Sequence, residues 1–291
     1  MNGVRRSGIK SRLTITATWL GMTIAMTAGI VHGGAVAQTQ ATSTHDRAEL
    51  TIYAAGSLRA ALTQISQDFQ AKTGLQPRLV FGASGLLKDR LTGGEQADLF
   101  ASANMDHPLA LAKSGHAVQV QPFTRNELCA LSTALFAADA RPLVAKLLDE
   151  RWRLGISTPK ADPSGDYAFE MFDRIERTGT GPAGSALALK QRALQLTGGP
   201  QSPPPPVGRS VYGALVAQGQ ADVFITYCTN AAGAVVEEPA LKSLPIEPAI
   251  NVSATYGVAV MKGNGPATQR FLEHLLGSEG QARLRALGFS P

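Results

Sequence analysis

The sequence has few of the side chains on which metal sites and nucleophilic catalysis depend. Among its 291 residues there are two cysteines and five histidines. Cys129 and Cys228 lack the short spacing of a structural zinc site. No His-Glu-x-x-His or Gly-x-Ser-x-Gly motif occurs, and no histidine lies in a recognisable catalytic motif. An activated serine needs a base within reach, so a serine hydrolase is the less favoured alternative and we expect no enzyme.

An excess of positive charge is also missing once the N-terminal segment is set aside. Residues 1–37 begin with four basic side chains and continue with an uncharged apolar stretch, 13–31, and the triplet Ala35-Val36-Ala37. This order predicts a signal peptide, and a membrane anchor is the alternative because the stretch is nearly long enough to span. The remainder carries 23 basic and 22 acidic residues, so a nucleic-acid-binding function, which needs a basic patch or stripe, loses its main support.

The predicted export bears on whether the two cysteines can form a disulfide. No cysteine lies near the predicted cleavage site to carry a lipid anchor, so we predict a periplasmic protein. In that oxidising compartment Cys129 and Cys228 are either bonded to each other or are two buried thiols. The segment 38–48 is polar and without apolar periodicity, which predicts a flexible tail.

Strand-like and helix-like segments alternate along the rest of the chain. The strand-like segment 50–54 precedes a helical pattern that ends at Gly74, and strand-like segments 78–81 and 97–101 flank a second helical pattern. The alternation returns with strand-like segments at 154–157 and 222–227. Strands that alternate with helices predict an α/β fold with mainly parallel sheets flanked by helices.

Two lobes built on one plan would account for this recurrence. The segments 96–100 and 220–224 are close matches, and each follows a glycine-containing turn. A late strand at 256–261 and two C-terminal helices are expected to return to the first lobe. The two crossings would make a hinge beside a ligand cleft. The predicted bounds are 49–128 plus 257–291 for lobe 1 and 129–256 for lobe 2.

Turns that carry serine lie between several strands and the helices that follow. Each leaves unpaired backbone N–H groups at a helix start, where the helix dipole is positive. Such turns form an anion site from neutral groups, although one alone is ordinary helix capping. The turns are Gly56-Ser57, Ala83-Ser84-Gly85, Pro163-Ser164-Gly165 and Ser210-Val211.

The sequence around these turns resembles the periplasmic molybdate-binding proteins of ABC importers. The motifs that carry the resemblance are 54–58, 82–85, 97–103 and 211–227, and the similarity spans about 50–289. It implies a monomeric two-lobed protein that delivers molybdate or tungstate to a membrane permease and its ATPase. It implies no cofactor and no direct ligand to a metal ion, because the oxyanion is held through its oxygens. The implied donors are the hydroxyls of Ser57 and Ser84, the amides of Ser164 and Val211, and the phenol of Tyr227.

Several alternatives remain at the sequence level. A cage made only of donors suits a dianion whose oxygens are pure acceptors, and it disfavours protonated phosphate. If Arg59 or Arg209 points inward, the site becomes cationic and an organic acid becomes a candidate. Ferric iron would need clustered tyrosines, and the other four tyrosines are expected to lie far from Tyr227. Other oxyanions, sulfate among them, and a sensor with the same fold also remain open.

Overall fold

The computed structural model describes residues 50–204, 206 and 208–291, and these lie in one compact unit, His45–Pro291. The predicted signal peptide and the tail 38–48 fall outside the described residues. Within the described part of the chain, no helix combines the length and the apolar character needed to cross a membrane.

Lobe 1 is built on three parallel strands with a helix after each. Its elements are β1 (Thr51–Ala55), η1 (Gly56–Leu58), α1 (Arg59–Thr73), β2 (Arg78–Gly82), α2 (Ser84–Thr92), β3 (Leu99–Ser102) and α3 (Asp106–Lys113). Strand β1 pairs in parallel with both β2 and β3. All five β1 residues are buried, as expected of a parallel strand covered on both faces. The apolar face of α1 is buried, and the helix ends at Gly74 in the left-handed conformation.

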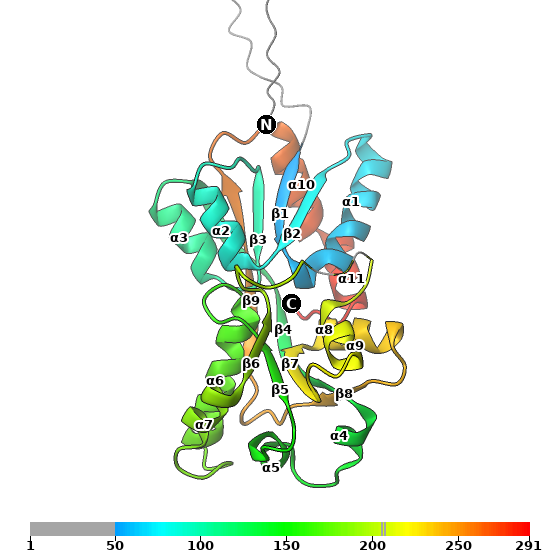
Figure 1. Ribbon diagram of the computed structural model, residues 1–291. Coiled ribbons are helices and arrows are strands. Elements are labelled where there is room, and N and C mark those ends of the chain that lie inside the picture. Colours follow the sequence, from blue (N-terminus) through cyan, green and yellow to red (C-terminus); the bar gives the residue numbers. More distant parts are fainter. Residues whose placement is uncertain (1–49, 205, 207) are drawn as a thin grey trace, which may run out of the picture. The chain divides into compact units, whose positions relative to one another are not determined.

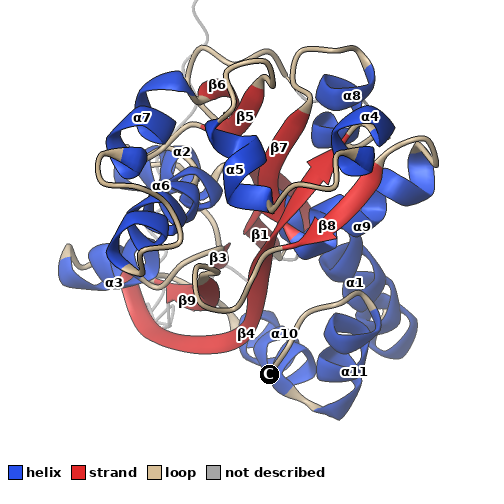
Figure 2. Ribbon diagram, turned by 90° about the horizontal axis from the view of Figure 1, so that it is seen from below, coloured by secondary structure: helices blue, strands red, loops and turns tan. Residues whose placement is uncertain are grey.

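Lobe 2 repeats the arrangement with β7, β5 and β6 as its parallel strands. Its strands are β5 (Leu154–Ser157), β6 (Leu194–Thr197), β7 (Val223–Tyr227) and β8 (Lys242–Pro245). Its helices are α4 (Ala134–Ala138), α5 (Leu143–Leu148), α6 (Pro163–Arg177), α7 (Ser185–Arg192), α8 (Val211–Ala217) and α9 (Cys228–Glu237). Figure 2 shows α6 and α7 on one side of these strands and α8 and α9 on the other. Sheets with helices on both faces confirm the predicted α/β class.

Two long antiparallel strands join the lobes. They are β4 (Ala117–Ser132) and β9 (Ser253–Met261), and the helices α10 (Pro266–Leu276) and α11 (Ser278–Ala286) follow. Strand β4 pairs with β9 up to Glu127 and with β7 and β8 from Leu128 and Cys129 onward. Strand β9 adds pairing with β3 from Gly257. The predicted lobe bounds therefore fall within these two strands, where the pairing changes, and the bounds themselves stay a prediction.

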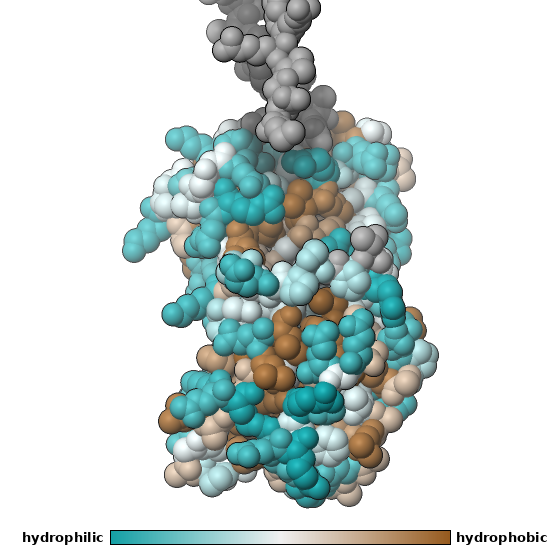
Figure 3. All heavy atoms as spheres, viewed as in Figure 1, coloured by the Kyte–Doolittle hydropathy of each residue, from teal (hydrophilic) through white to brown (hydrophobic). Residues whose placement is uncertain are grey.

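The strand order is β2-β1-β3-β9-β4-β7-β5-β6, with β8 paired to β4. The antiparallel strands thus occupy the centre, and the parallel strands of each lobe lie outside them (Figure 1). On the face shown in Figure 3, hydrophobic residues gather near the middle and hydrophilic residues lie around them. Four of the five candidate site residues lie in the turns or first helical residues that follow β1, β2, β5 and β6, and the fifth, Tyr227, ends β7.

Candidate functional site

Ser57 lies in the short turn that connects β1 to α1. Its Oγ is 2.9 Å from the hydroxyl of Tyr256 on β9, and either group can be the donor. Tyr256 is completely buried, and the Asn126 amide on β4 also donates to its hydroxyl at 3.4 Å. Ser57 is thereby held by the two strands that join the lobes.

Ser84 is the first residue of α2, directly after the turn that ends β2. Its side chain is buried, and its Oγ accepts a hydrogen bond from the Ala103 N–H at 3.1 Å. The hydroxyl is therefore used as an acceptor, and its proton is still free to be donated to a ligand. Ala103 follows β3, so this bond ties two loops of lobe 1 together.

Tyr227 ends β7 in lobe 2, and its hydroxyl donates to the Ala103 carbonyl of lobe 1 at 3.3 Å. One residue, Ala103, therefore contacts both Ser84 and Tyr227. Burial raises the pKa of the Tyr227 phenol well above its ordinary value, because the phenolate would lose its hydration. The phenol stays a neutral donor in the physiological range.

The expectation that the other four tyrosines lie far from Tyr227 is wrong for Tyr256 and Tyr167. The rings of Tyr256 and Tyr167 lie 5.5 Å and 6.4 Å from its ring, centroid to centroid. Sequence reasoning missed this because Tyr256 reaches the site through the long-range pairing of β9 with β4. Burial raises the pKa of all three phenols, which disfavours the phenolates that ferric iron requires.

Ser164 is the second residue of α6, and its backbone N–H already donates a hydrogen bond. It donates to Oδ1 of Asp162, the N-cap residue, at 3.1 Å. The Ser164 side chain is buried, and its hydroxyl has no hydrogen-bond partner among the described residues. The amide expected to bind the ligand thus has an internal acceptor.

Asp162 is a site residue that sequence reasoning missed. Its carboxyl is partly buried, and burial raises its pKa to about 6, while the hydrogen bond from the Ser164 N–H opposes the shift. The signal was present as an aspartate before Pro163, which is a strong N-cap pattern. This turn therefore contains a carboxyl acceptor, in contrast to the expected cage made only of donors.

Val211 opens α8 behind its N-cap Ser210, whose hydroxyl accepts from the Gly213 N–H at 3.2 Å. The next residue, Tyr212, packs its ring on Phe224 of β7 at 5.3 Å. No contact recorded among the described residues joins Val211 to Ser57, Ser84 or Tyr227. Of the five predicted donors, the structure thus links the three hydroxyls most directly.

The lobes also touch between α2 and the loop before α6. The Gly85 N–H donates to the Ala161 carbonyl at 2.9 Å. A Cβ at Gly85 would lie 2.4 Å from the Lys160 oxygen and 2.7 Å from the Ala161 oxygen, so only glycine fits. Lys160 itself has a positive φ of 68°, which is uncommon for a residue with a side chain.

Comparison with known proteins decides the family. Residues 50–290 match the bacterial extracellular solute-binding proteins. The chain belongs to this family. An uncharacterized protein of Pasteurella multocida is 36% identical over 83% of this chain and 98% of its own length. The molybdate-binding protein ModA of Mycobacterium tuberculosis is 26% identical over 94% of this chain and 98% of its own.

The fold of this solute-binding protein is that of the two-lobed periplasmic binding proteins. The sulfate-binding protein SubI of Mycobacterium tuberculosis superposes with a TM-score of 0.68 at 17% identity, over 84% of this chain and 86% of that one. At this identity the likeness concerns the fold alone.

The two arginines beside the turns of this solute-binding protein have partners at the surface. Arg209 forms an ion pair with Glu238, and its side chain is 54% exposed. The Arg59 guanidinium lies over the Phe81 ring, 4.5 Å from its centroid, and the residue is exposed. Neither contact makes an arginine fork next to Tyr227.

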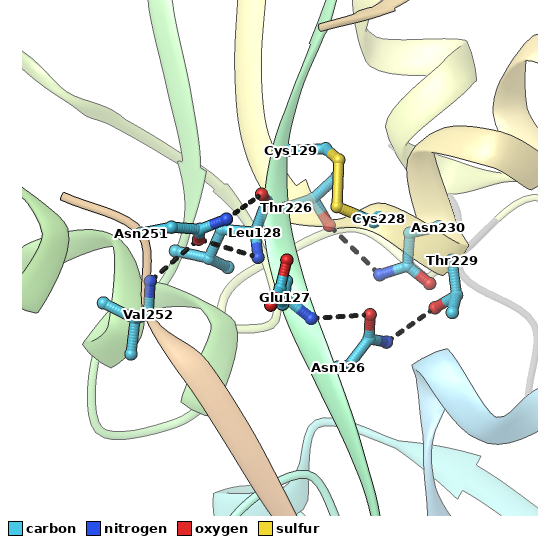
Figure 4. Close-up of a disulfide and its surroundings, with 10 residues drawn as sticks. All are labelled: Asn126, Glu127, Leu128, Cys129, Thr226, Cys228, Thr229, Asn230, Asn251 and Val252. Atoms are coloured by element: carbon cyan, nitrogen blue, oxygen red, sulfur yellow. Dashed lines mark hydrogen bonds between the residues drawn. A yellow bond between two sulfur atoms is a disulfide. The ribbon is translucent and has the colours of Figure 1, made fainter. Parts of the chain in front are cut away.

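Cys129 on β4 and Cys228 at the start of α9 form a disulfide (Figure 4). It immediately follows Tyr227 and ties the end of β7 to β4. Two amide side chains support the same junction, because Asn230 donates to Thr226 at 3.0 Å and Asn126 donates to Thr229 at 2.8 Å. The strand end that presents the Tyr227 phenol is therefore anchored on both sides.

Proposed function

We propose that this protein is the periplasmic receptor of an ABC importer and that it captures molybdate, with tungstate as the second ligand. It would release the oxyanion to a membrane permease driven by its ATPase. The family membership and the ModA relatives support this reading. The proposed ligand groups are Ser57, Ser84 and Tyr227 through their hydroxyls, and Ser164 and Val211 through their amides.

The observation that carries the proposal is the hydrogen-bond chain across the lobes. Tyr227 of lobe 2 donates to Ala103, and Ala103 donates to Ser84 of lobe 1. Ser57 joins the same group through Tyr256, whose ring contacts Tyr227. These contacts between described residues connect hydroxyl groups of both lobes, and they include no positively charged side chain.

Neutral donors suit a desolvated dianion. Each molybdate oxygen is a pure acceptor, and an O–H or N–H that replaces its water leaves no counter-charge behind when the ligand departs. The Tyr227 phenol has one proton, so it would exchange the Ala103 carbonyl for a ligand oxygen. A carbonyl that holds the phenol in place between ligands keeps a buried donor satisfied.

The test is calorimetry of the purified protein with a panel of oxyanions. We expect one-to-one binding of molybdate and tungstate, with sulfate and phosphate much weaker. Size then accounts for the preference over sulfate, because both dianions present only acceptors. Sulfate binding as tight as molybdate binding, or no heat with molybdate, would contradict the proposal.

A further inference from the structure

Tyr256 and Asn126 form a buried polar chain between the two halves of the candidate site. Tyr256 lies on β9 and Asn126 on β4, the two strands that join the lobes, and both side chains are buried. The chain of hydrogen bonds runs from Ser57 in lobe 1 through Tyr256 and Asn126 to Thr229, close behind Tyr227 in lobe 2. Ser57 is only half-buried, and it is the member of the chain that the proposed function assigns to the ligand.

The orientation of the Asn126 amide follows from its contact with the next residue. Its Oδ1 accepts a hydrogen bond from the Glu127 N–H at 3.0 Å, and a backbone N–H can only donate (Figure 4). The NH₂ group is therefore the end of the amide that faces the two hydroxyls. It donates to the Thr229 hydroxyl at 2.8 Å and to the Tyr256 hydroxyl at 3.4 Å.

The Tyr256 phenol then has one acceptor for its own proton. Its hydrogen bonds within the described part of the chain are those with Asn126 and Ser57, and an NH₂ group does not accept. The Ser57 Oγ, 2.9 Å away, is thus the acceptor that remains. A buried O–H without an acceptor would be costly, and burial also keeps the phenol protonated because it raises the pKa of Tyr256.

We propose that Asn126 and Tyr256 set the direction of the Ser57 hydroxyl. Tyr256 donates to the Ser57 Oγ, so the Ser57 proton is left for the ligand. Both are positioning residues, since they act on the ligand through Ser57. Ser84 is arranged in the same way, because the Ala103 N–H already donates to its oxygen. The inference rests on the proposed function, because Ser57 is one of the ligand groups named there.

This direction favours an oxyanion without a proton of its own. Ser57 meets the ligand as a donor, and each molybdate oxygen is a pure acceptor. The hydroxyl of hydrogen phosphate needs an acceptor, and it would have to compete with the Tyr256 proton for the Ser57 oxygen. The buried chain therefore adds to the preference for molybdate over phosphate.

The experiment is calorimetry of Tyr256→Phe with molybdate and with phosphate, at a mildly alkaline pH where both ligands are dianions. The new ring keeps the aromatic contacts of Tyr256 with Phe123, Tyr227 and Phe289, and thermal unfolding checks that the variant is folded. We expect the molybdate Kd to rise about three- to tenfold, and the phosphate-to-molybdate ratio of Kd values to fall, because the Ser57 hydroxyl is free to turn.

The sign of the change tests the direction of the bond. If Ser57 donates to Tyr256 in the wild type, loss of the phenol frees the Ser57 proton, and molybdate binds more tightly to Tyr256→Phe. Tighter binding, or a molybdate Kd equal to that of the wild type, would overturn the inference.

A double-mutant cycle with Ser57→Ala separates this role from a general effect on the fold. If Tyr256 acts through Ser57, Tyr256→Phe has no further effect on molybdate binding once the Ser57 hydroxyl is absent. Equal losses with and without that hydroxyl would show a merely structural role and refute the inference. Tyr53→Phe is the control, because its hydroxyl donates to Glu95 and its loss should change neither Kd.

Asn126→Asp provides a second test, because it reverses the chain. Its carboxylate would accept the Tyr256 proton, so that Tyr256 would accept from Ser57 and use the proton otherwise left for the ligand. The added negative charge weakens both dianions alike, so the phosphate-to-molybdate ratio of Kd values reports on the direction of the bonds. We expect this ratio to fall by about fivefold or more, and a ratio equal to the wild type's would contradict the inference.

The inference and the proposed function fail in different ways. Absence of molybdate binding by the wild type would refute the proposed function. Tight molybdate binding by the wild type, with variants of Tyr256 and Asn126 that keep its affinity and its preference over phosphate, would refute the inference alone.

Discussion

At the scale of single residues, the candidate site contains hydroxyl groups whose positions are set by hydrogen bonds to the Ala103 backbone. Ser84 accepts from Ala103 and keeps its own proton, while Tyr227 is buried and stays protonated. When a buried donor to an anion is removed, the anion oxygen is left without a hydrogen bond and cannot regain the water that it lost on binding. The loss of binding free energy therefore includes this desolvation cost. The hydroxyls are therefore expected to contribute individually to affinity.

Removal of either hydroxyl should weaken molybdate binding without abolishing the fold. We expect Ser84→Ala and Tyr227→Phe each to lose about 1–3 kcal/mol of binding free energy, or roughly 5- to 150-fold in Kd, by calorimetry. Tyr53→Phe is the control for the phenol, because the Tyr53 hydroxyl donates to Glu95 at 2.5 Å, away from the site. Ser114→Ala is the corresponding control for Ser84→Ala, because it also removes a serine hydroxyl. Variants at Ser84 and Tyr227 that bind like these controls would remove both residues from the site.

Local sequence patterns indicated some residues of the candidate site and missed others. The strand-turn-helix pattern pointed to Ser57 and Ser84, because each stands at an element boundary that local periodicity reveals, and the family resemblance added Tyr227. It did not locate Tyr256, whose contact with Ser57 spans 199 positions of the chain. Asp162 was visible as a cap, but its proximity to Gly198, which lies in another loop, was not.

At the scale of elements, most of the proposed ligand groups lie at the starts of helices that follow strands. The parallel strands and the helices after them could be predicted, because alternation and glycine stops are local signals. The sixteen-residue strand β4 was not predicted. It has no single period, since one end faces β9 and the other faces β7 and β8, so its two parts are buried against different neighbours.

The α2 start offers a test of how the lobes meet. Gly85→Ala places a Cβ where the Lys160 and Ala161 carbonyl oxygens leave no room, although alanine favours a helix by about 1 kcal/mol over glycine. We expect a thermal stability close to the wild type and a molybdate affinity at least tenfold lower. Gly233→Ala on α9 is the matched control, because nothing lies within 4 Å of its added Cβ. Equal affinity in both variants would show that this contact is not needed for ligand capture.

At the scale of the whole molecule, β4 and β9 provide the connection through which two lobes can open and close. A ligand held by both lobes favours the closed arrangement by its differential affinity for it. The bonds from Tyr227 to Ala103 and from Gly85 to Ala161 already join the lobes in this structure. Release would require both bonds to break together with those to the ligand.

The measurement that tests the central claim most directly is a crystal structure of the molybdate complex with anomalous data at the molybdenum edge. The account predicts one molybdenum peak between the lobes. The oxygens around it should lie about 2.7–3.2 Å from the hydroxyls of Ser57, Ser84 and Tyr227. A peak away from these three residues, or no ordered molybdenum at saturating molybdate, would contradict it.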